Sequence, residues 1–476
     1  MLKKISFTLI SVFFLSACSV QQFLGYESAN NEKLSRISTN NCDFTNINSL
    51  EFDEEGLKSV KDELYNGTFY GYQMFLCKNY KNSIKAFDLV ENAHKNNDET
   101  NIALQVGKEL LKMLLNDNIL DYTGKNYEKM LVNTYKAMDY LALGDFDSAG
   151  VEINRALDRQ KRNKEYYEGK INSLLNSSSF SSKEKDEVMQ IASSVKIPYY
   201  EAYKDYSNPF VSYFASLFYI LDDRPSLAIN LLQEVYTQEK NISVFQDHAL
   251  VVNNFNYKKI PNKIRKNIEK SKNDKYIWLI YENGKTRAFG EMNLSIPIIF
   301  YQKDAENVEY ALYLKPTSDN NHLVITSVVF SIPILKYSSD SYMFLYANNK
   351  KTSQISNMDN IVTAEYQAAL PREIAKSFLS TVGKTLASVK ANKKNLLAGV
   401  GVDLANNLLN HSDTRHFVGL PKNYQVARIA NNGKLVVKSP EGVEILNTEL
   451  DTNKHYVILV KSPNYGIFYT HILKGR

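Results

Sequence analysis

The spacing of hydrophobic residues changes near residue 275, and the change divides the chain into two predicted halves. From about residue 50 to 265, apolar residues recur three and four positions apart, a spacing typical of amphipathic helices. From Tyr276 onward, short apolar runs alternate with Asn-Gly and other turn signals, as strands and turns do. The sequence therefore predicts an α+β protein, with an all-helical domain over 46–270 and a mainly β C-terminal domain over 271–476.

Three segments of the helical half, 70–93, 134–157 and 213–236, resemble tetratricopeptide (TPR) repeats. In such repeats small residues let two helices approach, and bulky residues fill the groove of the next pair. The small residues Ser83, Ala149 and Ala228 are 66 and 79 positions apart, whereas TPR units repeat every ~34 residues. We therefore expect an irregular TPR-like solenoid, the alternative being a plain helical domain with coincidental small residues. The expected packing positions are Gly71, Tyr80, Ser83, Phe87, Ala137, Tyr140, Gly144, Ala149, Ile153, Ala156, Ala228 and Leu232.

The C-terminal half contains eight strand candidates and two helices. Asn283-Gly284 and Asn432-Gly433 are typical of tight hairpins, because both residues tolerate positive φ. One predicted helix begins near Pro371 and the other covers 396–409, which places an inserted helical pair at about 360–410. The strand candidates are 276–281, 307–314, 322–330, 341–347, 424–430, 434–438, 455–461 and 465–473.

The first eighteen residues have the layout of an export signal. Two lysines precede an apolar run over 5–15, which is shorter than the ~20 residues of a membrane-spanning helix. The following Leu-Ser-Ala-Cys resembles the lipobox of bacterial lipoproteins. This resemblance implies removal of 1–17 and lipidation of Cys18 with acyl chains such as palmitate, which anchor a protein stably to a membrane. The alternative is an ordinary secretory signal.

The region after the lipobox is polar and lacks sustained periodicity, so we expect a flexible tether over 18–45. Ser19, in place of an aspartate, favours the periplasmic side of the outer membrane, with the cell surface or inner membrane as alternatives. Cys42 and Cys77 could form a disulfide in the periplasm or remain two free thiols.

Charge and motifs point away from several classes of function. The net charge of +5 falls to +3 without the signal peptide, and we expect no nucleic-acid partner. Gly383-Lys384-Thr385 resembles the end of a P-loop, but Phe378 stands where that loop needs glycine, so no nucleotide site is expected. The seven histidines lack metal-ligand spacing. We expect no metal, no cofactor and no enzymatic activity.

Asp413 and Arg415 lie in the most distinctive polar string of the C-terminal half, HSDTRHFVGLP. They are candidates for a polar anchor that contacts a ligand. The alternative, which we favour, is a capped turn in which Arg415 pairs with a carboxylate.

The whole arrangement resembles an uncharacterised family of Gram-negative lipoproteins that have a lipobox, a TPR-like helical half and a β-rich C-terminal half. The resemblance rests on Cys18 and on the strings LALGDFDSAGVEINRAL, YENGK, ALPREIAKS and DTRHFVGLP. It implies a role in the cell envelope and assigns no catalytic residue.

We expect a scaffold or adaptor that binds envelope proteins through its TPR-like helical surface. One alternative is a glycan-processing enzyme with its site in the β-rich half. Another is a subunit of an oligomeric export apparatus, with 396–409 buried between copies. The oligomeric state stays open.

Overall fold

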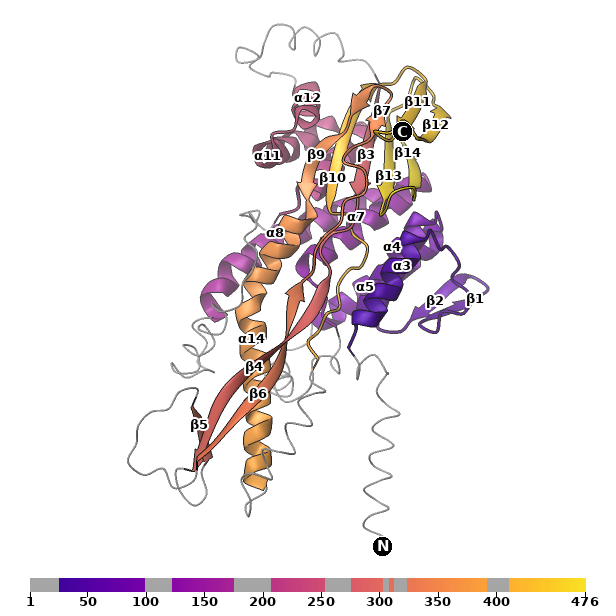
Figure 1. Ribbon diagram of the computed structural model, residues 1–476. Coiled ribbons are helices and arrows are strands. Elements are labelled where there is room, and N and C mark those ends of the chain that lie inside the picture. The colour runs from indigo at the N-terminus through magenta and orange to yellow at the C-terminus, as the bar shows by residue number, and fades with distance from the viewer. Residues whose placement is uncertain are drawn as a thin grey trace.

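The computed structural model describes residues 25–98, 122–174, 207–252, 275–302, 308–311, 323–391 and 411–476. Helices dominate the N-terminal half and sheets the C-terminal half, which confirms the coarse α and β division (Figure 1). Three predicted features lie outside the described residues: the signal peptide, Cys18 and the helix at 396–409.

Each TPR-like segment forms a pair of helices, and successive helices contact one another along the chain. The first pair crosses closely because Gly71 has no side chain: a Cβ there would lie 2.7 Å from Phe87. Ser83 Oγ also donates to the Gly71 carbonyl at 2.8 Å. The helices are α4 (Thr68–Leu76), α5 (Tyr80–Asp98), α7 (Asn126–Ala142), α8 (Phe146–Leu174), α10 (Pro209–Leu221), η3 (Pro225–Ala228), α11 (Ile229–Glu239) and α12 (Ile242–Val251).

The expected packing residues mostly lie inside these helix pairs. Tyr80 and Tyr140 are half-buried, and Gly144 occupies an exposed turn with φ of +80°. The fully buried members are Gly71, Ser83, Phe87, Ala137, Ala149, Ile153, Ala156, Ala228 and Leu232.

The predicted flexible tether is wrong from residue 27 onward, because Glu27–Ser38 form helix α3 and pack on the body. Its buried positions include Asn30, Lys33 and Ile37, spaced as one face of a helix. Two of these three are polar, so hydropathy gave no helical signal. A disulfide between Cys42 and Cys77, with Cα atoms 5.7 Å apart, attaches the chain after α3 to the end of α4.

Short elements between α3 and α4 also depart from the expected all-helical pattern. They are an antiparallel pair of strands, β1 (Leu50–Asp53) and β2 (Gly56–Val60), and the π-helical turn η1 (Glu63–Gly67).

The central sheet of the C-terminal half has five strands in the order β14-β13-β3-β10-β9. All eight residues of β3 are buried, and β3 pairs in parallel with β13 and antiparallel with β10. One face, with Trp278 and Ile280, belongs to the same hydrophobic core as the helices. The strands are β3 (Tyr276–Asn283), β9 (Ser353–Asn357), β10 (Asn423–Ala430), β13 (Tyr456–Ser462) and β14 (Tyr469–Lys474).

The opposite face of the central sheet packs on a smaller sheet with the order β12-β11-β7-β8. Ile277 and Leu279 of β3 contribute to this second core. The helical and β-rich halves therefore share one core along the Trp278 face of β3, and the other face of β3 belongs to the second core. The smaller sheet consists of β7 (Tyr346–Ala347), β8 (Lys350–Lys351), β11 (Lys434–Lys438) and β12 (Glu444–Glu449).

Neither Asn-Gly pair makes the predicted hairpin. Gly284 and Gly433 adopt positive φ, but Asn283 and Asn432 do not, so neither pair has the two positive φ angles of the expected turn. In addition, β3 pairs with β10 and β13, and β10 pairs with β3 and β9, so neither turn joins two paired neighbours. A Cβ on Gly284 would lie 2.0 Å from the carbonyl oxygen of Ser339, so a distant loop packs where a hairpin partner was expected.

A three-stranded sheet and a long helix, α14, extend from the body side by side (Figure 1). α14 begins at Met358, and Pro371 lies inside it, whereas the prediction placed its start near Pro371. Asn357 Oδ1 accepts from the Asp359 amide, which supplies the start signal. The elements are β4 (Phe289–Gln302), β5 (Val308–Ala311), β6 (Leu323–Leu335) and α14 (Met358–Ala391).

Candidate functional site

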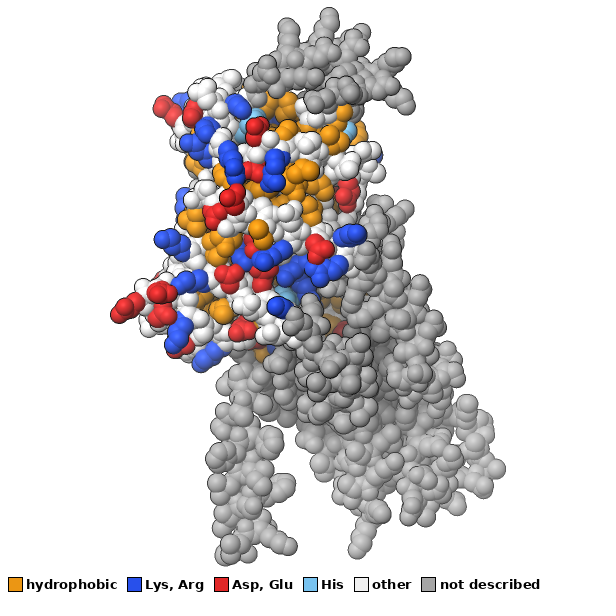
Figure 2. Space-filling model, turned by 180° about the vertical axis from the view of Figure 1, so that it is seen from behind, with side chains coloured by type: hydrophobic (Ala, Val, Ile, Leu, Met, Phe, Trp, Pro, Cys, Tyr) orange, Lys and Arg blue, Asp and Glu red, His pale blue; other side chains and the backbone are white. Residues whose placement is uncertain are grey.

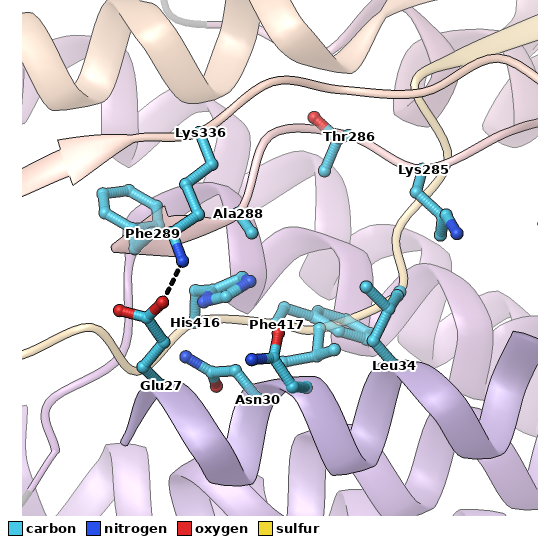
Figure 3. A pocket seen from close by; sticks show the side chains of 13 residues that line it. Glu27, Asn30, Leu34, Lys285, Thr286, Ala288, Phe289, Lys336, His416 and Phe417 are labelled. Atoms are coloured by element: carbon cyan, nitrogen blue, oxygen red, sulfur yellow. Dashed lines mark hydrogen bonds and ion pairs between the residues drawn. The ribbon is translucent and has the colours of Figure 1, made fainter. Parts of the chain in front are cut away.

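A small cleft of about 30 Å³ lies between α3 and segments of the C-terminal half (Figure 3). Leu34 and two asparagines of α3 form one wall. The chain between β3 and β4, Lys336 and the segment 416–419 form the remainder. The cleft thus exists only because the predicted tether is a packed helix.

The two ends of the cleft differ in charge. At one end Lys336 forms an ion pair with Glu27 of α3 (Figure 3). At the other end Lys285 Nζ donates to Asn464 Oδ1 at 2.6 Å. Within the described residues, Lys285 has no carboxylate in ion-pair range. Partial burial lowers the pKa of Lys285.

The floor of the cleft is fixed to helix α7. The Phe417 amide donates to Glu128 Oε1 at 2.8 Å, and Tyr122 donates to the same carboxylate at 2.9 Å. Burial raises the pKa of Glu128 to about 7. His416 Nδ1 lies 2.9 Å from the Thr414 carbonyl, and burial lowers the pKa of His416 to about 4, so its ring is neutral at pH 7.

Asp413 and Arg415, the predicted polar anchor, bind each other. Arg415 Nε and Nη2 each donate to an Asp413 oxygen at 2.9 Å. Arg415 also lies 3.4 Å from Asp62, and its guanidinium is 4.6 Å from the ring of Tyr26. Because Arg415 is buried among these partners, the pair joins the chain before α3, the segment before α4 and residues 413–415. This arrangement favours the capped-turn interpretation.

Three large apolar side chains are strongly exposed on two loops, one beginning at Lys336 and one containing Asn464, and we call them the exposed rim. They are Tyr337 (92% exposed), Met343 (75%) and Tyr465 (66%). Tyr337 follows Lys336 of the cleft, and Tyr465 follows Asn464, which binds Lys285. The sequence gave no signal for the rim, because exposure of single residues in loops has no periodicity.

The two loops of the exposed rim are held in place by buried partners. Tyr465 packs edge-on against Tyr342, with ring centroids 4.8 Å apart, and the Gly466 amide donates to the Tyr342 hydroxyl at 3.1 Å. The Ser341 and Ser462 hydroxyls lie 2.7 Å apart. The rim is therefore a preorganised surface.

A separate cluster of polar side chains, which we call the buried seam, joins the helices to the central sheet. Tyr72 and Tyr135 donate to Glu282 at 2.7 and 2.9 Å, and the Tyr424 hydroxyl lies 2.9 Å from that of Tyr135. Lys461, opposite Glu282 on β13, donates to the Gly284 carbonyl at 3.0 Å.

Burial dominates the protonation of the buried seam. Burial raises the pKa of Glu282 and lowers the pKa of Lys461 to about 7. No sequence motif marks the seam, because its five residues come from five different elements: Tyr72, Tyr135, Glu282, Tyr424 and Lys461.

The described part of the chain has neither a metal-holding cluster nor a helix suited to cross a membrane. No group of three or more His, Cys, Asp or Glu side chains there is arranged to hold a metal ion. No helix among the same residues is both long and apolar enough to cross a membrane.

Comparison of the chain with protein-family models, with curated proteins and with solved structures finds no match. The resemblance to a lipoprotein family and the lipidation of Cys18 therefore stay predictions from the sequence.

Proposed function

We propose that the protein is a scaffold lipoprotein, held on the periplasmic side of the outer membrane by lipid on Cys18, that binds a partner protein of the cell envelope. The partner would contact the exposed rim and the adjoining cleft. The observation that carries this proposal is the exposure of Tyr337, Met343 and Tyr465 on two loops joined by the Tyr342–Tyr465 ring contact and the Ser341–Ser462 hydrogen bond.

Residue type, clustering and rigidity support a binding role for the exposed rim. Single exposed apolar residues are normal on protein surfaces, but here three large ones lie on two loops that contact each other. Tyrosine and methionine are enriched at protein interfaces. Because the loops are already ordered, binding would cost little conformational entropy.

The helical half supports the scaffold role in a different way. Its helix pairs stack in sequence order, and Gly71 packs against Phe87, as an irregular TPR-like solenoid requires. On the face seen in Figure 2, acidic and basic side chains are interspersed with hydrophobic ones. We place the principal contact at the exposed rim and not on the helices, because the rim has the more exposed aromatic side chains.

The buried acids favour a scaffold over a hydrolase. A general acid or base must reach the substrate. Glu128 and Glu282 instead accept hydrogen bonds from tyrosines inside the core, and Asp139 accepts one from Ser83 at 2.6 Å. These acids join segments of the fold.

Site-specific photocrosslinking in living cells tests the proposal. A photoreactive amino acid replaces Tyr465, and the matched control position is Val443, which is 51% exposed on the turn before β12. We expect a discrete adduct with an envelope protein at position 465 and none at 443, and we expect Cys18→Ala to abolish it. No adduct at 465, or the same adducts at both positions, would contradict the proposal.

A further inference from the structure

The register between β13 and β14 determines which backbone groups of β14 point away from the central sheet. β14 is the terminal strand of that sheet (Figure 1). The Gly475 amide donates to the carbonyl of His455 at 2.8 Å, in line with the antiparallel register of the two strands. Antiparallel strands bond through alternate pairs of residues. The amide and carbonyl groups of Thr470, Ile472 and Lys474 therefore point outward, away from β13.

These outward groups are free to bind another chain. None of them has a hydrogen-bond partner among the described residues. Ile472 is 42% exposed, and Lys474 is exposed as well. The next outward amide, that of Arg476, donates to the Leu221 carbonyl at 3.1 Å and so ends the unpaired stretch. We call the stretch from Thr470 to Lys474 the β14 edge.

The opposite edge of the same sheet is covered. The side-chain amide of Asn241, at the start of α12, donates to the Ser353 and Gln354 carbonyls of β9 at 3.2 and 2.8 Å. Unpaired strand edges invite pairing with other chains, and proteins usually cover them or protect them with charged side chains. Lys474 is the only Lys, Arg, Asp or Glu in β14. The β14 edge thus lacks the cover that β9 has.

The β14 edge leads into the exposed rim. Tyr465 lies on the loop that joins β13 to β14, four positions before Tyr469, the first residue of β14. A strand that pairs with the β14 edge and extends past Thr470 therefore runs towards Tyr465. This continuity favours a single occupant for the two surfaces.

We propose that the envelope partner adds an extended segment to the central sheet, as a strand paired with the β14 edge, and that this segment continues onto the exposed rim. This inference rests on the proposed function and specifies how the partner binds. In strand addition, main-chain hydrogen bonds supply affinity and neighbouring side chains supply specificity. Exposed Ile472 favours an apolar or β-branched residue beside it on the added strand.

Proline at position 472 tests the inference in living cells. Ile472→Pro removes one outward amide and no hydrogen bond to β13, and edge strands accept proline at such positions. We expect the yield of the adduct from a photoreactive residue at 465 to fall about tenfold, the scale of one lost hydrogen bond. Ile472→Val, the matched control, keeps the amide and should retain the adduct. Equal yields in Ile472→Pro and the wild type would overturn the inference.

Amide hydrogen exchange of the purified full chain separates loss of pairing from misfolding. In the free chain the amides of Thr470, Ile472 and Lys474 should exchange rapidly, and those of His471 and Leu473 slowly. The same contrast between bonded and outward amides should persist in Ile472→Pro. In the purified 465 adduct the three outward amides of the wild-type β14 should become slow. Outward amides that are slow in the free chain, or that stay rapid in the adduct, would contradict strand addition.

A second crosslinking position distinguishes failure of this inference from failure of the proposed function. A photoreactive residue at 472 should capture the same envelope protein as one at 465. If 472 captures a second copy of this chain instead, β14 pairs with itself and the inference fails. If 465 captures an envelope protein and 472 captures nothing, the inference fails and the scaffold proposal stands. If 465 captures nothing, the scaffold proposal fails, and the inference that rests on it fails too.

Discussion

Tyrosine and lysine side chains gather in two regions of this molecule, and the two regions use them in opposite ways. In the buried seam the hydroxyls of Tyr72 and Tyr135 donate hydrogen bonds to Glu282, and the side chain of Lys461 is fully buried. At the cleft and exposed rim, Tyr465 presents most of its surface to solvent and Lys285 lacks a carboxylate among the described residues. Hydrogen-bond partners and burial, not residue type, therefore distinguish side chains that hold the fold together from side chains that are available for binding.

Removal of Glu282 should have the largest effect on stability. Glu282→Leu leaves two buried hydroxyls without their acceptor and Lys461 without its nearby carboxylate. We expect a loss of about 3–5 kcal/mol in the free energy of unfolding, measured by urea denaturation. Glu444→Ala, on exposed β12, is the control and should leave the midpoint unchanged. If Glu282→Leu matches that control, the seam does not stabilise the fold.

A double variant sharpens the same comparison. Adding Lys461→Met to Glu282→Leu removes the buried amine that has lost its nearby carboxyl group, so the double variant should recover part of the lost stability. A double variant that is less stable than Glu282→Leu alone would contradict coupling between the two side chains.

Loss of the Cys42–Cys77 disulfide should lower the local stability of α3, which forms a wall of the cleft, more than that of β3, which belongs to the buried seam. The bond closes a loop with a sequence separation of 35 residues, and such bonds contribute about 2–4 kcal/mol. In the variant with both cysteines replaced by serine, amide hydrogen exchange should rise in α3 and remain slow in β3. Equal acceleration in both elements would mean that the disulfide does not act locally on the cleft wall.

The pH dependence of stability should distinguish Lys461 from Lys285. Burial lowers the folded-state pKa of Lys461 to about 7, below its usual 10.5. Its contribution to stability is therefore complete above pH 10.5 and is lost as the pH falls towards 7. The slope is at most about 1.4 kcal/mol per pH unit. Between pH 7 and 9, Lys461→Met should reduce the slope of the unfolding free energy against pH. Lys285→Met should reduce that slope less. The same slope in both variants would contradict this assignment.

Removal of one hydroxyl group should give the smallest contrast. Tyr135→Phe deletes a buried donor to Glu282 and should cost about 1–2 kcal/mol. Tyr465→Phe removes an exposed hydroxyl and should leave the melting temperature unchanged. Differential scanning calorimetry of both variants measures the contrast, and equal shifts would contradict it.

Local patterns in the sequence predicted the helix pairs and most of the central sheet. Gly71 and Ser83 indicate a close helix crossing, and the apolar run from Tyr276 indicates a buried strand. In both cases the residues that determine the structure are close together in the sequence. The helix α3 was missed because Asn30 and Lys33 occupy its buried face, where their side chains bind Thr414 and Asn66 from distant segments.

Contacts between distant segments explain the other failures. Asn283-Gly284 has the sequence of a hairpin turn, but its strand pairs with residues more than 130 positions away. The mutual pairing of Asp413 and Arg415 is local and was foreseen as an alternative, whereas their contacts with Asp62 and Tyr26 were not. The cleft escaped prediction entirely, because Lys285, Lys336 and α3 meet only in the folded chain.

The most direct measurement of the central claim is the pattern of photocrosslinks from positions 465 and 443 in intact cells. We expect one predominant adduct with an envelope protein from position 465, lost in Cys18→Ala, and none from 443. No adduct from 465, or identical adducts from both positions, would show that the exposed rim is not a specific binding surface.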